Sequence, residues 1–298
     1  MMSRARPHRR RHTWAMLSPF VLALVLFVLT PLAGSLALAF CRGGGSAGFH
    51  FAGLVNFRFL LHDKLFWWSV LNTTVYAGAY LLFQTPLSLA IAAGLCSPRA
   101  RLKSAVRFAM LCPYFIGPVY ASVLFGAMLD TRYGLVNQVL SAVLMREVGI
   151  PFLDDPRLAM VSMLMVSLWL GVGFGSLYLA AAMQGISREL YDAAHVDGAA
   201  SWGCFWHITL PSVRPTLALL VLVGTIQAFQ LFELPYVLFG GPGPSSAGLT
   251  VVMYLYGTGF EAGDFGYASA IGWTVVVVLA ALMLGQYVLL RRVLRGVR

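Results

Sequence analysis

Long apolar segments alternate with shorter polar or glycine-rich stretches along the whole chain. Six of them exceed twenty residues: Trp14–Phe40, Phe66–Cys96, Val106–Met128, Leu158–Met183, Thr216–Phe239 and Ala268–Leu290. A helix rises about 1.5 Å per residue, so about 20 apolar residues cross the ~30 Å hydrocarbon core of a bilayer. The pattern therefore predicts six transmembrane helices. The first segment is longer than the roughly 7–15 apolar residues of a signal-peptide core, so we expect an uncleaved anchor.

The composition places the chain in the same class. Of its 298 residues, 59% are hydrophobic and only 11% are charged, with a mean hydropathy of +0.78. A soluble domain is nearer half apolar and about 25% charged, and disordered chains are poor in apolar residues. These values exclude both classes and indicate an all-α membrane protein.

The net charge of +10 is distributed unevenly about the predicted spans. Fifteen of the 21 basic residues fall on the side of the N-terminus: Arg4, Arg6, Arg9, Arg10, Arg11, Arg99, Arg101, Lys103, Arg107, Arg188, Arg214, Arg291, Arg292, Arg295 and Arg298. The positive-inside rule then places both termini in the cytoplasm. We expect cytoplasmic tails at 1–13 and 291–298 around a transmembrane domain at 14–290, and no role in binding nucleic acid.

Catalytic and cofactor signals are missing from the sequence. The four cysteines are scattered without a CxxC pair, so we expect small apolar side chains and no metal site. The only lysines, Lys64 and Lys103, do not follow glycine as a Walker A lysine does. The spans contain no Ser–His pair, Asp pair or HExxH motif of an intramembrane enzyme. We therefore expect no catalytic residue, no cofactor and no ATP site in this chain.

The stretch 184–215, between the fourth and fifth spans, is too long for a simple connection. Its part Ile186–Pro215, called the elbow below, predicts a helix over Arg188–His195 capped by Ser187, a break at Gly198 and a second helix over Ala199–Ile208. We expect Leu210-Pro211 to end that second helix. The elbow has small and aromatic residues where a solvated loop would be charged, which suits either a docked protein or lipid headgroups.

The elbow resembles the EAA loop of ABC-importer permease subunits. The matching residues are Asp192-Ala193-Ala194, Gly198 and Ile208-x-Leu210-Pro211, with Asp192 where the family usually has Glu. Segments such as CPYFIGPV (112–119), YGLVNQVL (133–140) and FELPYVLFGGPG (232–243) are similar to the carbohydrate branch, that of lactose, glycerol-3-phosphate and arabinose importers. The coupling residues implied are Asp192, Ala193, Ala194, Asp197, Gly198, Ala199, Phe205, Ile208, Leu210 and Pro211.

The resemblance also implies an assembly in a bacterial inner membrane. The fold would be the six-helix transmembrane domain of a type I ABC importer. A second, homologous permease would form a heterodimer around the path, two ATPase subunits would bind ATP and Mg²⁺, and an extracytoplasmic solute-binding protein would deliver the solute. Asp192 would meet a basic residue of the ATPase, and Gly198 would set the bend of the elbow.

Polar and aromatic residues in the spans are candidates for the solute path. Gln227, Gln230 and Glu233 recur at i, i+3 and i+6 and predict one drifting helix face that could pair with sugar hydroxyls. Hydrogen bonds between spans, or a place at the interface, are the alternatives. The same choice between path and scaffold applies to Asn72, Tyr114, Trp169 and Tyr267. The turn Gly240–Pro244 could approach a solute or a partner subunit, although Phe239 stands where many relatives have a small polar residue.

These patterns are compatible with three alternative transport functions. The first is import of a carbohydrate, which includes polyols and glycerol phosphates. The second is import of another solute, such as an amino acid or a peptide. The third is an ATP-independent channel or secondary transporter. The sequence names neither the solute nor the partner subunits.

Overall fold

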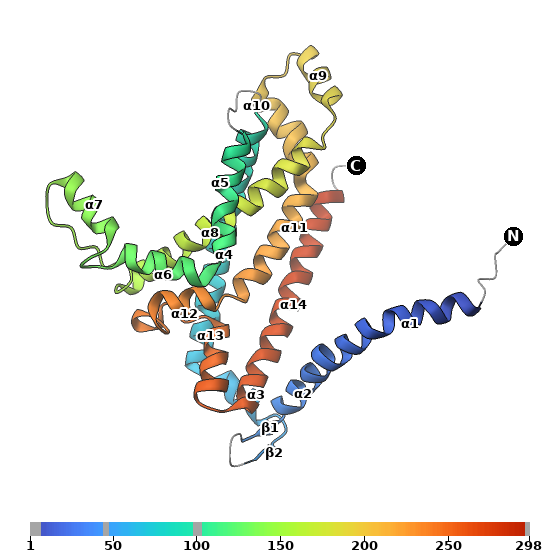
Figure 1. The fold of residues 1–298 in the computed structure, drawn as a ribbon, viewed down its shortest axis with the longest axis vertical. Coiled ribbons are helices and arrows are strands. Elements are labelled where there is room, and N and C mark those ends of the chain that lie inside the picture. The colour runs from blue at the N-terminus through green and yellow to red at the C-terminus, as the bar shows by residue number, and fades with distance from the viewer. Residues whose placement is uncertain (1–6, 44–47, 98–102, 296–298) are drawn as a thin grey trace. The chain divides into compact units, whose positions relative to one another are not determined.

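The computed structural model describes residues 7–43, 48–97 and 103–295, which are almost entirely helical (Figure 1). Contacts divide the chain into two compact units, which are described separately. One unit comprises Met1–Asp63 and Leu255–Val276; the other comprises Lys64–Tyr254 and Val277–Arg298. Arg4, Arg6, Arg99, Arg101 and Arg298, which contribute to the charge asymmetry, lie outside the described residues.

Six spans are confirmed, five as long helices and the third as a bent pair. The five long apolar helices are Met16–Ala39, Lys64–Cys96, Pro156–Gln184, Ser201–Phe229 and Phe265–Arg291. The apolar spans Met16–Ala39 and Phe265–Arg291 lie close to the predicted bounds, while the helices themselves extend further, since α1 begins at Pro7 and α14 continues to Arg295. Length and composition thus give the number of spans, while their ends extend beyond the apolar stretches.

The third span is not the straight helix that the prediction Val106–Met128 assumed. Helix α5 (Lys103–Ile116) and helix α6 (Pro118–Leu129) meet at an angle of 96°. Gly117 lies between them with φ 79° and ψ 160°, a conformation that glycine adopts without steric cost. Pro118 then starts α6, where its missing N–H costs no helical hydrogen bond. The Gly-Pro pair therefore turns the chain between two short helices.

The smaller unit combines the first span with a short hairpin and the start of the last span. Helices α1 (Pro7–Leu24) and α2 (Thr30–Ala39) lead to strands β1 (Cys41–Arg42) and β2 (His50–Phe51), which pair antiparallel. Helix α3 (Val55–His62) follows. Its buried Asn56 donates to the carbonyls of Ala39 and Cys41, at 2.9 and 2.8 Å. This side chain fixes the chain where it leaves the first span.

Two spans contain a π-helical turn immediately before a proline. The turn η1 (Val25–Leu29) precedes Thr30-Pro31, and η3 (Phe205–Thr209) precedes Leu210-Pro211. In each case the residue before proline donates its N–H five residues back, Thr30 to Val25 and Leu210 to Phe205. A proline ring collides with the carbonyl four residues earlier in an ordinary helix. The wider turn accommodates the ring, so the helix continues through the proline.

The larger unit is organised around helix α4 (Lys64–Cys96), which packs along α8 (Pro156–Gln184) and α11 (Leu210–Phe229). Helix α5 also packs on α8. Three glycines of α8 allow this close approach. A side chain at Gly175 would come within 2.7 Å of Gln84 and Ser88 of α4, and one at Gly173 would collide with the Met110 carbonyl of α5. Small residues at helix interfaces serve this purpose in membranes.

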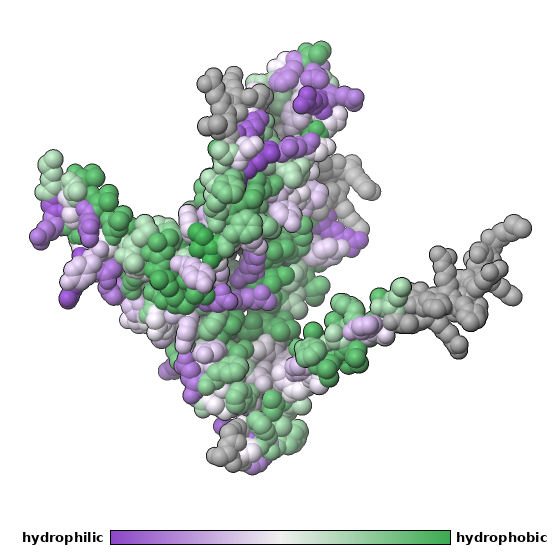
Figure 2. All heavy atoms as spheres, viewed as in Figure 1, coloured by the Kyte–Doolittle hydropathy of each residue, from purple (hydrophilic) through white to green (hydrophobic). Residues whose placement is uncertain are grey.

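The remaining elements of the larger unit are short. They are α7 (Leu135–Leu144), α9 (Arg188–Val196), α10 (Ser201–Cys204), α12 (Glu233–Phe239), the 3-10 turn η4 (Pro244–Ser246) and most of α13 (Val251–Tyr256); the π turn η5 (Gly257–Glu261) belongs to the smaller unit. Hydrophobic residues cover the visible surface of α5 and α6, whereas hydrophilic residues gather around α9 (Figure 2). The apolar helix surfaces suit lipid, and α9 suits water.

Substituting alanine for two different glycines should change the free energy of unfolding in opposite directions. Gly173→Ala should lower the free energy of unfolding by about 1–3 kcal/mol, because α5 and α8 must move apart. Gly78→Ala is the control, because a methyl group there meets no atom within 4 Å. It should be neutral or stabilising by about 0.4–1 kcal/mol. Thermal midpoints in detergent measure both, and equal shifts would contradict the packing described.

Candidate functional site

The elbow begins with a capped helix that ends at a glycine in the left-handed region. Ser187 precedes α9, and its Oγ accepts the Glu189 N–H at 3.3 Å, as predicted. Gly198 has φ +81°, and a side chain there would meet no atom within 4 Å. Glycine is required at this position because of the positive φ angle, and not because a side chain would collide with neighbouring atoms. The predicted break at Gly198 is confirmed.

The second half of the elbow differs from the prediction. Leu210-Pro211 does not end a helix: α10, η3 and α11 together form one helix from Ser201 to Phe229, 29 residues long. The π turn before Pro211 is the physical reason, since it admits the proline without breaking the helix. The elbow is therefore joined directly to the fifth span.

The two parts of the elbow are joined by a side-chain hydrogen bond and carry exposed apolar groups. Tyr191 Oη of α9 lies 2.8 Å from Thr209 Oγ1 of η3. Val196 is 88% exposed and Trp202 is 71% exposed, and Trp202 stacks on Phe205 with ring centroids 5.8 Å apart. Such large exposed side chains at a hydrophilic end of a helix bundle indicate a contact surface.

The coupling residues implied by the resemblance lie on this surface or partly buried beneath it. Asp192, Ala193, Asp197 and Gly198 are exposed, whereas Ala194, Ala199, Phe205, Ile208, Leu210 and Pro211 are partly buried. Two carboxylates thus face solvent beside apolar groups. In α9 of the elbow, acidic and aromatic or aliphatic side chains are presented together, an arrangement suited to a partner with basic and apolar groups.

The predicted polar face of the fifth span is interrupted. The predicted helix Thr216–Phe239 is wrong in this respect, because α11 ends at Phe229 and α12 starts at Glu233. We call the residues between them, 230–232, the polar break. Gln227, Gln230 and Glu233 are all exposed. Because the helix is interrupted between Gln227 and Glu233, the three side chains do not lie on one face of a continuous helix. A sequence signal was present, because Pro235 lies in the first turn of α12 and its ring excludes an ordinary helical position for the Leu231 carbonyl, four residues earlier.

Side chains from other segments satisfy the backbone at the polar break. Thr250 Oγ1 donates to the Leu231 carbonyl at 2.6 Å. Ser122 Oγ of α6 lies 2.7 Å from the Pro118 carbonyl of its own helix and 3.0 Å from the Leu234 carbonyl of α12. Unpaired carbonyls in a low-dielectric region are costly, so these contacts stabilise the interruption. The break is thus a fixed feature held by the tertiary structure.

A glycine-rich turn follows α12 and is attached to α4. Asn72, only 8% exposed, donates to the carbonyls of Ser246 and Leu249 at 2.9 and 3.2 Å. Thr73 Oγ1 accepts the Val251 N–H at 2.9 Å. The amide of Asn72, a candidate for the solute path, is therefore engaged in holding this segment.

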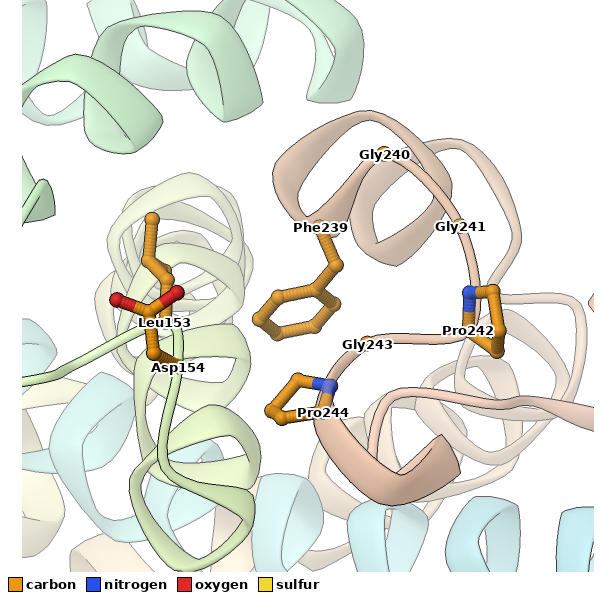
Figure 3. Close-up of a pocket in the computed structure, with 8 residues that line it drawn as sticks. All are labelled: Leu153, Asp154, Phe239, Gly240, Gly241, Pro242, Gly243 and Pro244. Carbon is orange, nitrogen blue, oxygen red and sulfur yellow. The ribbon is translucent and has the colours of Figure 1, made fainter.

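A pocket of about 310 Å³ lies beside the same turn (Figure 3). Its lining comes from two segments of the larger unit: Leu153, Asp154, Phe239, Gly240, Gly241, Pro242, Gly243 and Pro244. Gly240, Gly241 and Gly243 all have positive φ, so the turn needs glycine there. The backbone of the turn is consequently unshielded by side chains where it faces the pocket.

The other aromatic candidates make contacts with neighbouring side chains. Tyr114 of α5 stacks on Phe174 with centroids 4.7 Å apart, and Trp169 of α8 meets Phe125 edge-on at 5.2 Å. Tyr267 belongs to the smaller unit, where it is buried and donates to Asp63 Oδ2 at 2.5 Å. These contacts suit a scaffolding role, the alternative that the sequence left open.

Sequence reasoning missed polar groups inside the α4–α8 packing. Gln84 is buried in the middle of α4, and its Oε1 and Thr85 Oγ1 have no hydrogen-bond partner among the described residues. Gln286 of α14 donates to Thr225 of α11 at 2.9 Å. The sequence contained a signal for these residues, because each is a polar residue within an apolar span.

No group of three His, Cys, Asp or Glu residues able to hold a metal occurs in the described part of the chain.

Comparisons with known proteins agree with this geometry. Residues 84–298 match the family described as binding-protein-dependent transport system inner membrane component. The chain is 30% identical to the lactose transport system permease protein LacF of Rhizobium radiobacter, over 92% of each chain. It is 29% identical to the arabinooligosaccharides transport system permease protein AraP of Bacillus subtilis, over 90% of this chain and 84% of the relative.

Solved structures show the same architecture. A bacterial ABC transporter involved in the import of the acidic polysaccharide alginate matches with a TM-score of 0.85 and 27% identity, over 96% of each chain. The alginate transporter in complex with its alginate pentasaccharide-bound periplasmic protein also matches, with a TM-score of 0.85 and 25% identity.

The anchoring role of Asn72 can be tested by hydrogen exchange. Asn72→Leu leaves the Leu249 carbonyl without its side-chain donor and the Ser246 carbonyl with only Trp68 Nε1, at 3.3 Å. At a cost of about 1–3 kcal/mol, amides at 246–251 should exchange about tenfold faster or more. Thr74→Val is the control, because Thr74 bonds only within its own helix, to Val70. If Asn72→Leu exchanged no faster than this control, the anchoring role would be wrong.

Proposed function

Because the chain belongs to the family of inner membrane components of binding-protein-dependent transport systems, we propose that it is the permease subunit of a bacterial ABC importer for a carbohydrate. The observation that carries this proposal is the 30% identity to a lactose permease over 92% of both chains. Relatives named for lactose, arabinooligosaccharides and alginate favour a carbohydrate over an amino acid or peptide. They also favour an ATP-driven importer over a channel or secondary transporter.

The elbow is the docking site for the ATPase in this proposal. Its exposed carboxylates would pair with basic groups, and Trp202 and Val196 would fill apolar hollows of the partner. Hydrolysis of ATP, with its Mg²⁺, belongs to that partner, so this chain contributes no catalytic group. Docking would change the orientation of α9 and α10 when the two ATPase subunits close.

The continuous helix from Ser201 to Phe229 explains how such a change reaches the solute path. At about 1.5 Å per residue, its 29 residues extend for roughly 43 Å. Residues 201–215 of this helix lie in the elbow, and its last residue adjoins the polar break. A tilt imposed at the elbow would therefore displace Gln227 and Gln230 relative to α12. Exposed amides there can exchange hydrogen bonds with sugar hydroxyls.

The complete importer would contain three further kinds of subunit. They are a second homologous permease that completes the path, two ATPase subunits, and an extracytoplasmic solute-binding protein, the last supported by the periplasmic protein in the alginate complex. In the inner membrane, the charge asymmetry supports cytoplasmic termini, with tails at 1–13 and 291–298 around the domain at 14–290.

Docking through Asp192 predicts a selective loss of assembly. Asp192→Lys should weaken association with the ATPase about 30-fold or more, since loss of a buried charge partner typically costs about 2–5 kcal/mol. Glu189→Lys, also exposed on α9, is the matched control with the same change of charge. Co-purification and titration of the ATPase measure the effect. Equal weakening by both variants would point to general electrostatics and not to docking at Asp192.

The path assignment predicts a change in transport without loss of assembly. Gln230→Ala should raise the KM for uptake about tenfold, because one hydrogen bond to the solute is lost, and leave ATPase association unchanged. Ser212→Ala is the control on the same helix, because Ser212 bonds its own backbone at Ile208. Uptake into proteoliposomes, with the solute-binding protein present, measures KM. An unchanged KM would remove Gln230 from the path.

A further inference from the structure

The pocket beside the glycine turn combines an aromatic ring, a carboxylate and bare backbone. We infer that it is a second carbohydrate site, separate from the polar break, which accepts an uncharged sugar ring and disfavours an anionic one. This inference rests on the proposed function and specifies the charge of its substrate. Its volume of about 310 Å³ is at the lower end of small-molecule sites, which are roughly 300–1,000 Å³. That space suits one ring and not a long chain.

Phe239 provides the apolar part of the site. Its side chain extends from the end of α12 into the space between the Leu153–Asp154 segment and the turn (Figure 3). Gly243 and Gly248 pack against the ring, and a side chain at Gly248 would come within 2.7 Å of it. The ring is therefore held in place. Sugar rings present C–H groups on one face, which pack favourably on an aromatic surface.

Asp154 provides the polar part and the only charge among the eight lining residues. Its Oδ2 accepts a hydrogen bond from Thr131 at 2.7 Å, which orients the carboxylate. A carboxylate has about four acceptor positions, so several stay available for sugar hydroxyls. The neighbouring Arg132 interacts with Asp130, whose pKa is lowered mainly by the N–H groups of Tyr133 and Arg132 and further by the Arg132 charge.

The polar break also carries a negative charge, that of Glu233. Glu233 and Phe239 are the first and last residues of α12, about 9 Å apart along the helix. An anionic solute would therefore approach one carboxylate at the pocket and another at the break. A neutral sugar would meet acceptors for its hydroxyls at both places. The arrangement favours uncharged carbohydrates at two successive positions.

A matched pair of sugars tests this selectivity directly. Methyl β-glucoside and methyl β-glucuronide differ only by the carboxylate, and saturation-transfer NMR reports their binding to the assembled importer without its solute-binding protein. The wild type should bind the glucoside about fivefold more tightly. Asp154→Asn keeps the acceptor for Thr131 and should reduce this preference to the part that the Glu233 carboxylate provides. Phe239→Ala should weaken both sugars.

Asp155→Asn is the matched control for loss of a charge. Asp155 caps α8 through the Arg157 N–H and does not line the pocket, and Asn caps a helix equally well. The preference for the glucoside should survive in this variant. The inference is overturned if the wild type binds both sugars equally or neither, or if Asp154→Asn and Asp155→Asn behave alike. The proposed function fails separately, if no carbohydrate, neutral or anionic, stimulates ATP hydrolysis by the wild-type importer with its solute-binding protein.

Discussion

The need to satisfy every backbone hydrogen bond inside a bilayer governs this structure. Hydrocarbon offers no donor or acceptor, so the chain crosses as helices and departs from helical geometry only where other groups replace the lost bonds. Pro31 and Pro211 are accommodated by π turns. Thr250 supplies a donor at the polar break. These irregularities in the spans are thus accompanied by specific compensations.

The irregular places are also those to which we assign functional roles in the proposals above. The polar break exposes amides and a carboxylate, the glycine turn frames a pocket, and Gly198 separates the two halves of the elbow. Regular helix leaves no backbone group for a ligand, whereas an interruption presents both backbone and side chains. In the proposed function, the long helix between elbow and break would connect a surface for a partner with a surface for a solute. Its continuity through Pro211 is what makes such a connection possible.

The α4–α8 packing provides the rigid frame for these features. Glycines of α8 allow α4 and α5 to approach closely, and α4 in turn holds the turn after α12 through Asn72 and Thr73. The same frame buries Gln84 and Thr85. Because Gln84 Oε1 and Thr85 Oγ1 have no hydrogen-bond partner among the described residues, their burial costs stability, which the close packing of the two helices must offset.

The sequence by itself determined the class, the six spans, the elbow with its Ser187 cap and Gly198 break, and the resemblance to permeases. These follow from local properties: apolar length, capping chemistry and the conformational freedom of glycine. Only the tertiary structure decided that Pro211 lies within a continuous helix, that Gly117 bends the third span, and that the fifth span ends at Phe229. It also joined Asp154 to Phe239 in one pocket and gave Asn72 its partners. The reason is physical: a local pattern such as Gly117-Pro118 or Leu210-Pro211 permits a bend, a π turn or a helix end, and packing with distant segments, such as the Thr250 donor at Leu231, decides which of them occurs.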